Sequence, residues 1–298
     1  MSQNKIFDSE IVLPDARLTT QQHTLLGFDE RYRRVHDQLR LLLNIGELGD
    51  WNQKHHGGKL ALCDLVVEQH PLVIFHGDVG TGKTATAECI ANRLVTDARV
   101  EDSVLFRLSN RVRGTGKVGE MGTLLADAFQ KVTQAAGRGR RAILIIDEGD
   151  SLAAARSQDH SHHEDKVAVN TLIQAVDDIR RFGGRVLVFL CTNRLSVLDA
   201  ALHRRAALVE EFKRPNSEER RQLLEGDLEA LSLSEAQLGE LVAATGANDG
   251  QPPWTFSDIR TRLYPAALAL AFPKGPLEFE HLRSVATSMR PSPVMENL

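Results

Sequence analysis

Residues 77–84 read GDVGTGKT, a glycine-rich run that ends in a lysine and a threonine. It matches the pattern GxxxxGK[ST] and lies between an apolar run of strand length, LVIFH, and a helical stretch, TATAECIANRLV. Glycines in such a loop let backbone N–H groups curve around a β-phosphate at the N-terminus of the helix. An accidental glycine-rich turn does not account for the full motif in this context. The stretch therefore predicts an ATP site that contains Asp78, Val79, Gly80, Thr81, Gly82, the phosphate-neutralising Lys83 and the Mg²⁺-binding Thr84.

Apolar runs of strand length recur on both sides of this loop, and helical stretches separate them. The runs are PLVIF near residue 73, SVLFRL near 105, RAILIID near 144, RVLVFLC near 189 and LVEEF near 210. Alternating strands and helices imply a parallel sheet covered by helices on both faces, and strands of such a sheet are apolar almost throughout. We predict an α/β P-loop domain with a parallel five-stranded sheet over residues 25–215.

The two ends of the chain differ from this domain. Residues 1–24 are polar and aperiodic, and we expect them to form a flexible N-terminal arm. After Pro215 the strands stop, and Asn216 and Ser217 followed by two glutamates predict the start of a helix. The sequence predicts a small all-helical lid domain over residues 216–298, with helices near 217–230, 234–245, 255–272 and 277–288.

The composition disfavours several classes of protein. With 42% hydrophobic and 26% charged residues, the chain has ordinary globular usage, which argues against a disordered, fibrous or membrane-spanning protein. A formal net charge of -4 supplies no positive field that would attract nucleic acid or anionic lipid. The first residues lack a secretory signal pattern, and no apolar run approaches the ~18 residues of a membrane span. We therefore expect a cytoplasmic protein without a membrane partner, and nucleic acid is a disfavoured one.

Two further strand ends carry side chains suited to nucleotide hydrolysis. The run AILII ends in Asp147 and Glu148. We expect Asp147 to hold Mg²⁺ through water and Glu148 to polarise the attacking water as a general base. The run VLVFLC ends in Thr192 and Asn193, and the Asn193 amide is suited to orient the same water.

Arg204 and Arg205 lie in the segment LDAALHRR, just before the last predicted strand. One of the two guanidinium groups is expected to reach a γ-phosphate in a neighbouring subunit, where an arginine finger contributes ~10³ to 10⁵ in rate. A basic pair on the surface is the alternative interpretation. Upstream, Gly27 and Phe28 lie where the segment leading into the domain is expected to pack on adenine.

Taken in order, these residues resemble the AAA+ superfamily over roughly residues 25–290. Within it the chain is similar to the pachytene-checkpoint ATPases that remodel HORMA-domain proteins, including their bacterial counterparts in cyclic-nucleotide antiphage defence. The likeness is carried by IDEGDSLAAAR, VAVNTLIQAVDDIRRFGGRVLVFLCTN and LDAALHRRAALVEEF.

This resemblance implies an ATPase that forms a hexameric ring with active sites between its subunits. It implies partial unfolding of a HORMA-domain partner, itself bound to a nucleotidyltransferase. By the same likeness Arg205 is the finger and Arg204 its neighbour, and the pore loop that grips polypeptide contains Lys117, Val118 and Gly119.

Three features depart from the family pattern. Lys117 stands where many relatives carry an aromatic residue, so the grip would rest on Val118 and the aliphatic stem of Lys117. In the lid, the position of the phosphate-sensing arginine is matched by Asp258, and Arg260 is the predicted substitute. A short polar segment precedes Gly27 where eukaryotic relatives carry a folded domain, so substrate recognition would use the ring surface or the pore.

Three other functions fit parts of the same pattern. A general unfoldase that feeds a protease is the first, and the lack of an IGF-like docking tripeptide argues against it. A nucleic-acid clamp or helicase loader is the second, and the acidic pI near 6.3 and the lack of a basic, aromatic-interleaved patch weaken it. A signalling NTPase without turnover is the third, and the intact Asp147–Glu148 pair argues against that function.

Overall fold

The computed structural model describes residues 6–113, 120–152, 163–248 and 250–295, which divide into two compact units. The first unit comprises Met1–His76 and Thr84–Glu211. The second comprises Gly77–Lys83 and Phe212–Leu298. The first seven residues of the phosphate-binding motif therefore belong to the same unit as the C-terminal helices.

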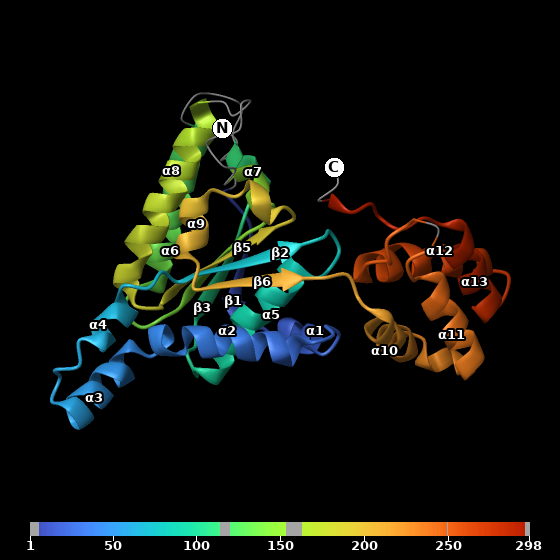
Figure 1. The fold of residues 1–298 in the computed structure, drawn as a ribbon, viewed down its shortest axis with the longest axis horizontal. Coiled ribbons are helices and arrows are strands. Elements are labelled where there is room, and N and C mark those ends of the chain that lie inside the picture. Colours follow the sequence, from blue (N-terminus) through green and yellow to red (C-terminus); the bar gives the residue numbers. More distant parts are fainter. Residues whose placement is uncertain (1–5, 114–119, 153–162, 249, 296–298) are drawn as a thin grey trace. The chain divides into compact units, whose positions relative to one another are not determined.

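Among the described residues, six strands form one sheet in the order β1-β3-β4-β5-β2-β6 (Figure 1). The pairs β2–β5, β3–β4 and β4–β5 are parallel, whereas β1 runs antiparallel to β3. The predicted α/β class and each of the five predicted strands are confirmed. The strands are Phe7–Leu13 (β1), Leu72–Gly77 (β2), Ser103–Leu108 (β3), Ala142–Ile146 (β4), Val186–Thr192 (β5) and Leu208–Phe212 (β6).

The sixth strand, β1, lies in the segment that the sequence predicts to be a flexible arm. Phe7 and Leu13 are buried, and the ring centroid of Phe7 lies 4.7 Å from that of Phe106. Helix α1 (Ala16–Gln22) follows, and the N–H of Asp15 at its N-cap donates to Asn92 Oδ1 over 2.7 Å. The predictions of a flexible arm and of a five-stranded sheet are therefore wrong for this segment. An edge strand buries only part of its side chains. The remaining side chains of β1 are polar or at least partly exposed, so the segment lacks the continuous apolar run that predicts a buried strand.

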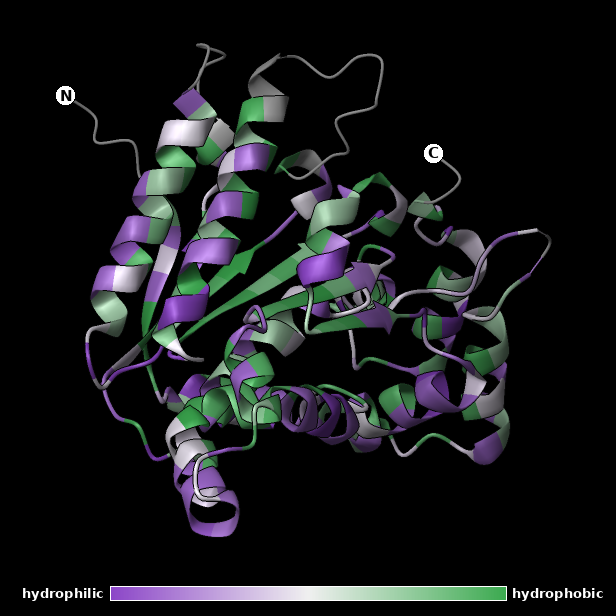
Figure 2. Cartoon of the chain, turned by 60° about the vertical axis from the view of Figure 1, so that its left-hand side comes forward, coloured by the Kyte–Doolittle hydropathy of each residue, from purple (hydrophilic) through white to green (hydrophobic). Residues whose placement is uncertain are grey.

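Helices cover both faces of the sheet because successive strand residues point to opposite sides. On one face, Ala142, Leu144 and Ile146 of β4 pack in a core cluster with α6 (Glu120–Ala136) and α8 (His163–Asp178). The alternate residues of β4, Ile143 and Ile145, are also buried. Figure 1 shows α2 (Phe28–Leu43) and α5 (Lys83–Asp97) on that opposite side. Figure 2 shows the strands as mostly hydrophobic and the helices as mixed, as a sheet covered on both faces requires.

Shorter elements complete the first unit. None of the helices in the described ranges is long and apolar enough to cross a membrane. The remaining helices of this unit are α3 (Ile45–His56), α4 (Leu62–Val67), α7 (Gly149–Leu152) and α9 (Ala200–Arg205), with short 3-10 turns at Asn110–Arg113, Ile179–Phe182 and Leu195–Val197.

The second unit is helical after β6, as the sequence predicts. A capping box starts α10, because the Asn216 side chain accepts from the backbone N–H of Glu219 and the Glu219 carboxylate accepts from that of Asn216. Trp254, Ile259 and Leu282 are buried in this unit. Its helices are α10 (Ser217–Asp227), α11 (Glu235–Ala244), a π-helical segment at Asp258–Leu263, α12 (Tyr264–Ala271) and α13 (Phe279–Ser288).

Candidate active site

The phosphate-binding loop joins β2 to α5 and has a conformation that depends on glycine. Gly77, Gly80 and Gly82 have φ of 135°, 77° and 93°, which disfavour residues with a Cβ. At Gly77 an added Cβ would lie 2.1 Å from the carbonyl oxygen of Phe212. The Lys83 ammonium is buried at the loop, where it donates to the carbonyl oxygens of Gly77 and Asp78, each over 2.8 Å. The loop therefore holds a positive charge within a curved run of backbone, as a phosphate site requires.

The other predicted residues of the loop are placed by contacts within the second unit. Thr81 is buried and its hydroxyl donates to the Asp78 carbonyl oxygen over 2.8 Å. The Asp78 carboxylate accepts from Arg214, a residue that sequence reasoning missed. The Val79 side chain is exposed. These contacts fix the loop backbone and leave Val79 on its surface.

Thr84 and Asp147 lie side by side in the first unit. The Thr84 hydroxyl donates to Asp147 Oδ2 over 2.8 Å, and Arg107 at the end of β3 donates to the same oxygen over 3.3 Å. Arg107 also lies 3.8 Å from Glu88, whose pKa is raised by burial although Arg107 opposes that effect. A hydroxyl beside a carboxylate supplies the hard oxygen ligands that Mg²⁺ prefers. The residues present therefore fit a magnesium ion.

Glu148 adopts a backbone conformation that is unusual for a residue with a side chain. Its φ is 52°, and its backbone N–H donates to Asp147 Oδ1 over 2.9 Å. Asn110, two residues after β3, donates from Nδ2 to Glu148 Oε2 over 3.2 Å. Uncommon backbone conformations of this kind occur at functional sites, where surrounding contacts maintain them. The Glu148 side chain is exposed, so water can reach its carboxylate.

Asn193 follows β5, and its backbone contacts Asp150 of α7, the short helix that comes after β4 and Asp147. Asp150 Oδ1 accepts from the Thr192 hydroxyl over 3.1 Å and from the Asn193 backbone N–H over 3.4 Å. Helix α7 packs tightly on β5, since a Cβ at Gly149 would lie 2.6 Å from Leu190. The structure thus brings the tips of β4 and β5 together through Asp150.

The two candidate finger residues differ in their surroundings. Arg205 makes a bidentate ion pair with Asp177, with distances of 2.7 Å from Nε and 2.9 Å from Nη2. His70 Nε2 also lies 2.7 Å from Asp177. Hydrogen bonding from Arg205 lowers the pKa of Asp177, whereas burial lowers the pKa of His70. Arg204, the neighbour on α9, is exposed.

The remaining predicted nucleotide contacts are Gly27 and Phe28 in the first unit and Arg260 in the second. Gly27 is the N-cap of α2 with φ of 70°, and Phe28 is buried with its ring stacked 6.2 Å from that of Tyr32. Both line a cavity of about 480 Å³. In the second unit Arg260 makes a bidentate pair with Asp227, with both distances 2.7 Å. The adenine and phosphate roles of these residues stay predictions.

The predicted pore residues Lys117, Val118 and Gly119 lie outside the described residues.

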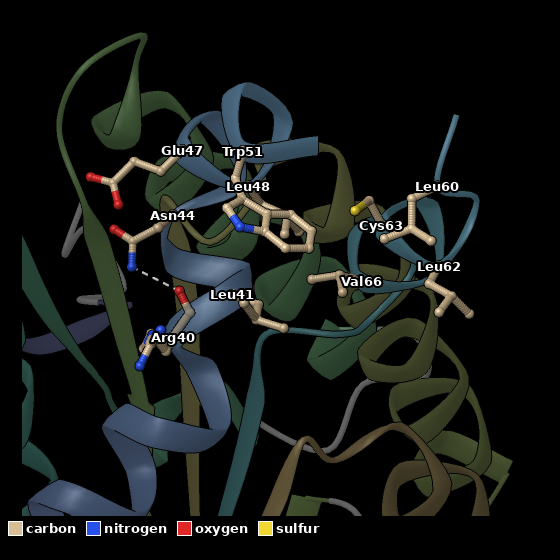
Figure 3. Close-up of a pocket in the computed structure, with 10 residues that line it drawn as sticks. All are labelled: Arg40, Leu41, Asn44, Glu47, Leu48, Trp51, Leu60, Leu62, Cys63 and Val66. Atoms are coloured by element: carbon tan, nitrogen blue, oxygen red, sulfur yellow. Dashed lines mark hydrogen bonds between the residues drawn. The ribbon is translucent and has the colours of Figure 1, made fainter. Parts of the chain in front are cut away.

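An apolar groove of about 560 Å³ lies where α3 and α4 meet the end of α2, and Figure 3 shows Trp51 and Leu41 on its walls. It carries none of the predicted site residues.

Sequence reasoning missed four polar residues that hold the site together. Each makes a contact between segments far apart in the chain, which no local motif encodes. Their common signal is position, because three of them lie within two residues of the end of a strand and the fourth lies two residues after the acidic pair. They are Arg107, Asn110, Arg214 and Asp150.

The chain is similar to known proteins over its whole length. Residues 73–214 match the family described as "ATPase family associated with various cellular activities (AAA)". CD-NTase-associated protein 6 of Escherichia coli strain KTE188 is 64% identical over 298 residues, which is 100% of both chains. The protein of the same name from E. coli strain MS 115-1 is 38% identical and covers 98% of this chain and 96% of its own.

Solved structures share the fold. A chain in the HORMA:CdnC:Trip13 complex of E. coli MS115-1 aligns with a TM-score of 0.87 at 37% identity, over 97% of both chains. Trip13 from Rhizobiales aligns with a TM-score of 0.70 at 30% identity, over 96% of this chain and 99% of that one.

Proposed function

This chain belongs to the AAA family of ATPases and, within it, to the CD-NTase-associated proteins 6, and from that membership we propose that it remodels a HORMA-domain protein in a CD-NTase antiphage pathway. The observation that carries the proposal is the Thr84–Asp147 contact next to Glu148 and Asn110, in a chain that aligns over 97% of its length with a chain of a HORMA:CdnC:Trip13 complex. ATP hydrolysis is the energy source for this work.

Each step of hydrolysis has a residue suited to it. Lys83 and the loop backbone bind the β- and γ-phosphates, and Thr84 and Asp147 would hold Mg²⁺. When bound, Mg²⁺ neutralises charge that develops on the phosphate oxygens. Glu148 accepts a proton from the attacking water, and Asn110 orients the Glu148 carboxylate. Asn193, tied to Asp150, orients the same water.

The active unit is a hexameric ring in the cytoplasm. A finger from Arg204 or Arg205, both on α9, reaches the phosphates of a neighbouring copy. Such a head-to-tail contact uses two different surfaces of each copy, and it generates a ring when the rotation between copies closes. In the closed ring, ATP at each interface requires residues from two subunits.

The partner is a HORMA-domain protein bound to a nucleotidyltransferase. The aligned complex contains HORMA, CdnC and Trip13 chains, which supports this assignment. The ring engages its partner with Lys117, Val118 and Gly119, and partial unfolding resets the HORMA domain. Release of the nucleotidyltransferase is the expected outcome.

The test uses the purified chain with the proposed HORMA-domain partner and the nucleotidyltransferase bound to it. The three components are incubated with ATP, and the HORMA–nucleotidyltransferase complex is followed by size-exclusion chromatography. We expect the complex to dissociate with ATP but to persist with ADP or with the Lys83→Ala variant, because that variant lacks the phosphate-binding cation. A complex that is equally stable with and without ATP would refute the proposed remodelling while leaving the ATPase assignment intact.

A further inference from the structure

An acidic side chain lies inside the phosphate-binding loop. Asp78 is the second residue of the motif, and its backbone carbonyl oxygen accepts from Lys83. Each oxygen of its carboxylate has a donor outside the loop, because Oδ2 accepts from Arg214 Nε over 2.7 Å and Oδ1 accepts from the Met295 backbone N–H over 3.0 Å. A carboxylate so close to a polyphosphate site would repel the ligand unless its charge is compensated.

Arg214 supplies that compensation from a buried position. Its side chain is 7% exposed and it follows β6 by two residues. Besides the Asp78 carboxylate, its guanidinium donates to three backbone carbonyl oxygens over 2.8 to 2.9 Å, those of Pro253, Ser292 and Pro293. A guanidinium can make this set of contacts because its donors point in fixed, divergent directions.

The segment after α13 contacts both Asp78 and Arg214. We call this segment, residues 289–295, the C-terminal strap. The Ser292 hydroxyl donates to Asp258 Oδ1 over 2.7 Å, and the Ser292 N–H lies 3.2 Å from Asp258 Oδ2. Asp258 is itself buried, and it accepts from Arg262 over 2.7 Å. The strap is therefore bound at Asp258, at Arg214 and at Asp78.

We propose that Arg214 is a positioning residue for nucleotide binding, which neutralises Asp78 and fastens the C-terminal strap to the phosphate-binding loop. Its guanidinium keeps the Asp78 charge from opposing the phosphates, and the strap supplies the second donor to that carboxylate. The inference rests on the nucleotide-binding role of residues 77–84. Arg214 and the strap lie outside the phosphate-binding motif and are not among the residues proposed for hydrolysis, yet both support nucleotide binding.

The first test measures the dissociation constant of a fluorescent ADP analogue by titration. We expect Arg214→Ala to weaken binding by at least about tenfold, because a carboxylate is left without its cation beside the phosphates. Adding Asp78→Asn to that variant is expected to restore most of the affinity, since an amide does not repel phosphate. The deficit of the single variant is expected to shrink at 1 M salt, where charge repulsion is screened.

The second test separates the charge of Arg214 from its contacts to the strap. Arg214→Lys keeps the charge but cannot donate to three carbonyl oxygens at once. We expect ADP affinity within about threefold of wild type, together with faster hydrogen exchange of the strap amides. This variant also carries the test if Arg214→Ala does not fold. Arg221→Ala, which removes a half-buried arginine paired with Glu235 in the same unit, is the matched control and is expected to bind ADP as wild type does.

Two results would overturn the inference. One is an Arg214→Ala variant that folds and binds ADP within about threefold of wild type. The other is a double variant that binds no more tightly than Arg214→Ala, because then the Asp78 charge is not what Arg214 compensates. The Lys83→Ala variant tests the phosphate-binding role of the loop separately. If that role is wrong, Lys83→Ala binds ADP with wild-type affinity.

Discussion

At the scale of single residues, the site is held by polar contacts between distant segments. The motif residues Lys83, Thr84 and Asp147 could be predicted because each lies in a contiguous pattern that ends a strand or begins a helix. Asn110 and Arg107 could not, because their partners are 38 and 40 residues away and only the folded sheet brings them together. The chemistry is local in sequence, whereas the positioning of the reactive groups depends on tertiary structure.

Glu148→Gln is predicted to abolish steady-state ATP hydrolysis while ATP binding and ring assembly persist. The amide keeps the size of the side chain and can still contact Asn110, but it cannot accept a proton from water. Phosphate release measures hydrolysis, and equilibrium binding of ATP measures the retained affinity. Hydrolysis within threefold of the wild-type rate would exclude Glu148 as the general base.

Arg205→Ala is predicted to abolish turnover in rings made of one variant and to lower thermal stability as well. The stability effect follows from the ion pair, because the change leaves Asp177 without its bidentate partner. Mixing this variant with Lys83→Ala subunits is expected to restore some activity, since interfaces that combine an intact finger with an intact loop then form.

Arg204→Ala is the matched control, because Arg204 is exposed on the same helix and its loss is expected to leave the melting temperature unchanged. If mixed rings with Arg205→Ala regain no activity at any ratio but those with Arg204→Ala do, Arg204 is the finger and Arg205 stabilises the subunit. The mixing experiment thus decides between the two arginines.

At the scale of elements, apolar sequence patterns predicted the strands that helices cover on both faces of the sheet. The five predicted strands and the lid helices were predictable because apolar runs and a helix-capping pattern are strong local signals. Strand β1 was not, because it pairs only with β3 and carries Asp8, Ser9 and Glu10 in its middle. Its place in the sheet is set by pairing with β3, as in the pair Leu13 and Ser103, and these residues are far apart in the sequence.

Asp258→Asn is predicted to destabilise the C-terminal unit at neutral pH and to flatten its dependence on acid. Burial alone would raise the pKa of Asp258, but hydrogen bonds from Ser292, Thr255 and Arg262 outweigh burial and lower that pKa. A lowered carboxyl pKa stabilises the folded state above the unfolded pKa of about 3.9, and this contribution is lost as the pH falls toward the folded value.

We expect the variant to lose about 2 kcal/mol of unfolding free energy at pH 7 and less at pH 3. Urea unfolding is followed by the fluorescence of the buried Trp254 in a Trp51→Phe background, where it is the remaining tryptophan. Equal destabilisation at both pH values would show that the loss does not come from the ionised carboxylate.

At the scale of the whole molecule, the predicted nucleotide-binding residues come from both units. The loop residues Gly77–Lys83 group with the C-terminal helices, whereas Thr84 and the acidic pair belong to the unit that contains the sheet. We expect ATP hydrolysis in the proposed ring to drive the work on its partner.

The final prediction concerns where that work is applied, at Lys117 and Val118 between the turn that ends at Arg113 and helix α6. The double variant Lys117→Ala, Val118→Ala removes apolar contact worth roughly 1 to 3 kcal/mol for each extended segment that is held. We expect basal ATPase activity to persist, stimulation by the HORMA-domain partner to vanish and remodelling to stop. Lys131→Ala, an exposed change on α6, is the control and is expected to leave all three unchanged. A double variant that still dissociates the partner at the wild-type rate would exclude threading through this loop and assign the work to the ring surface.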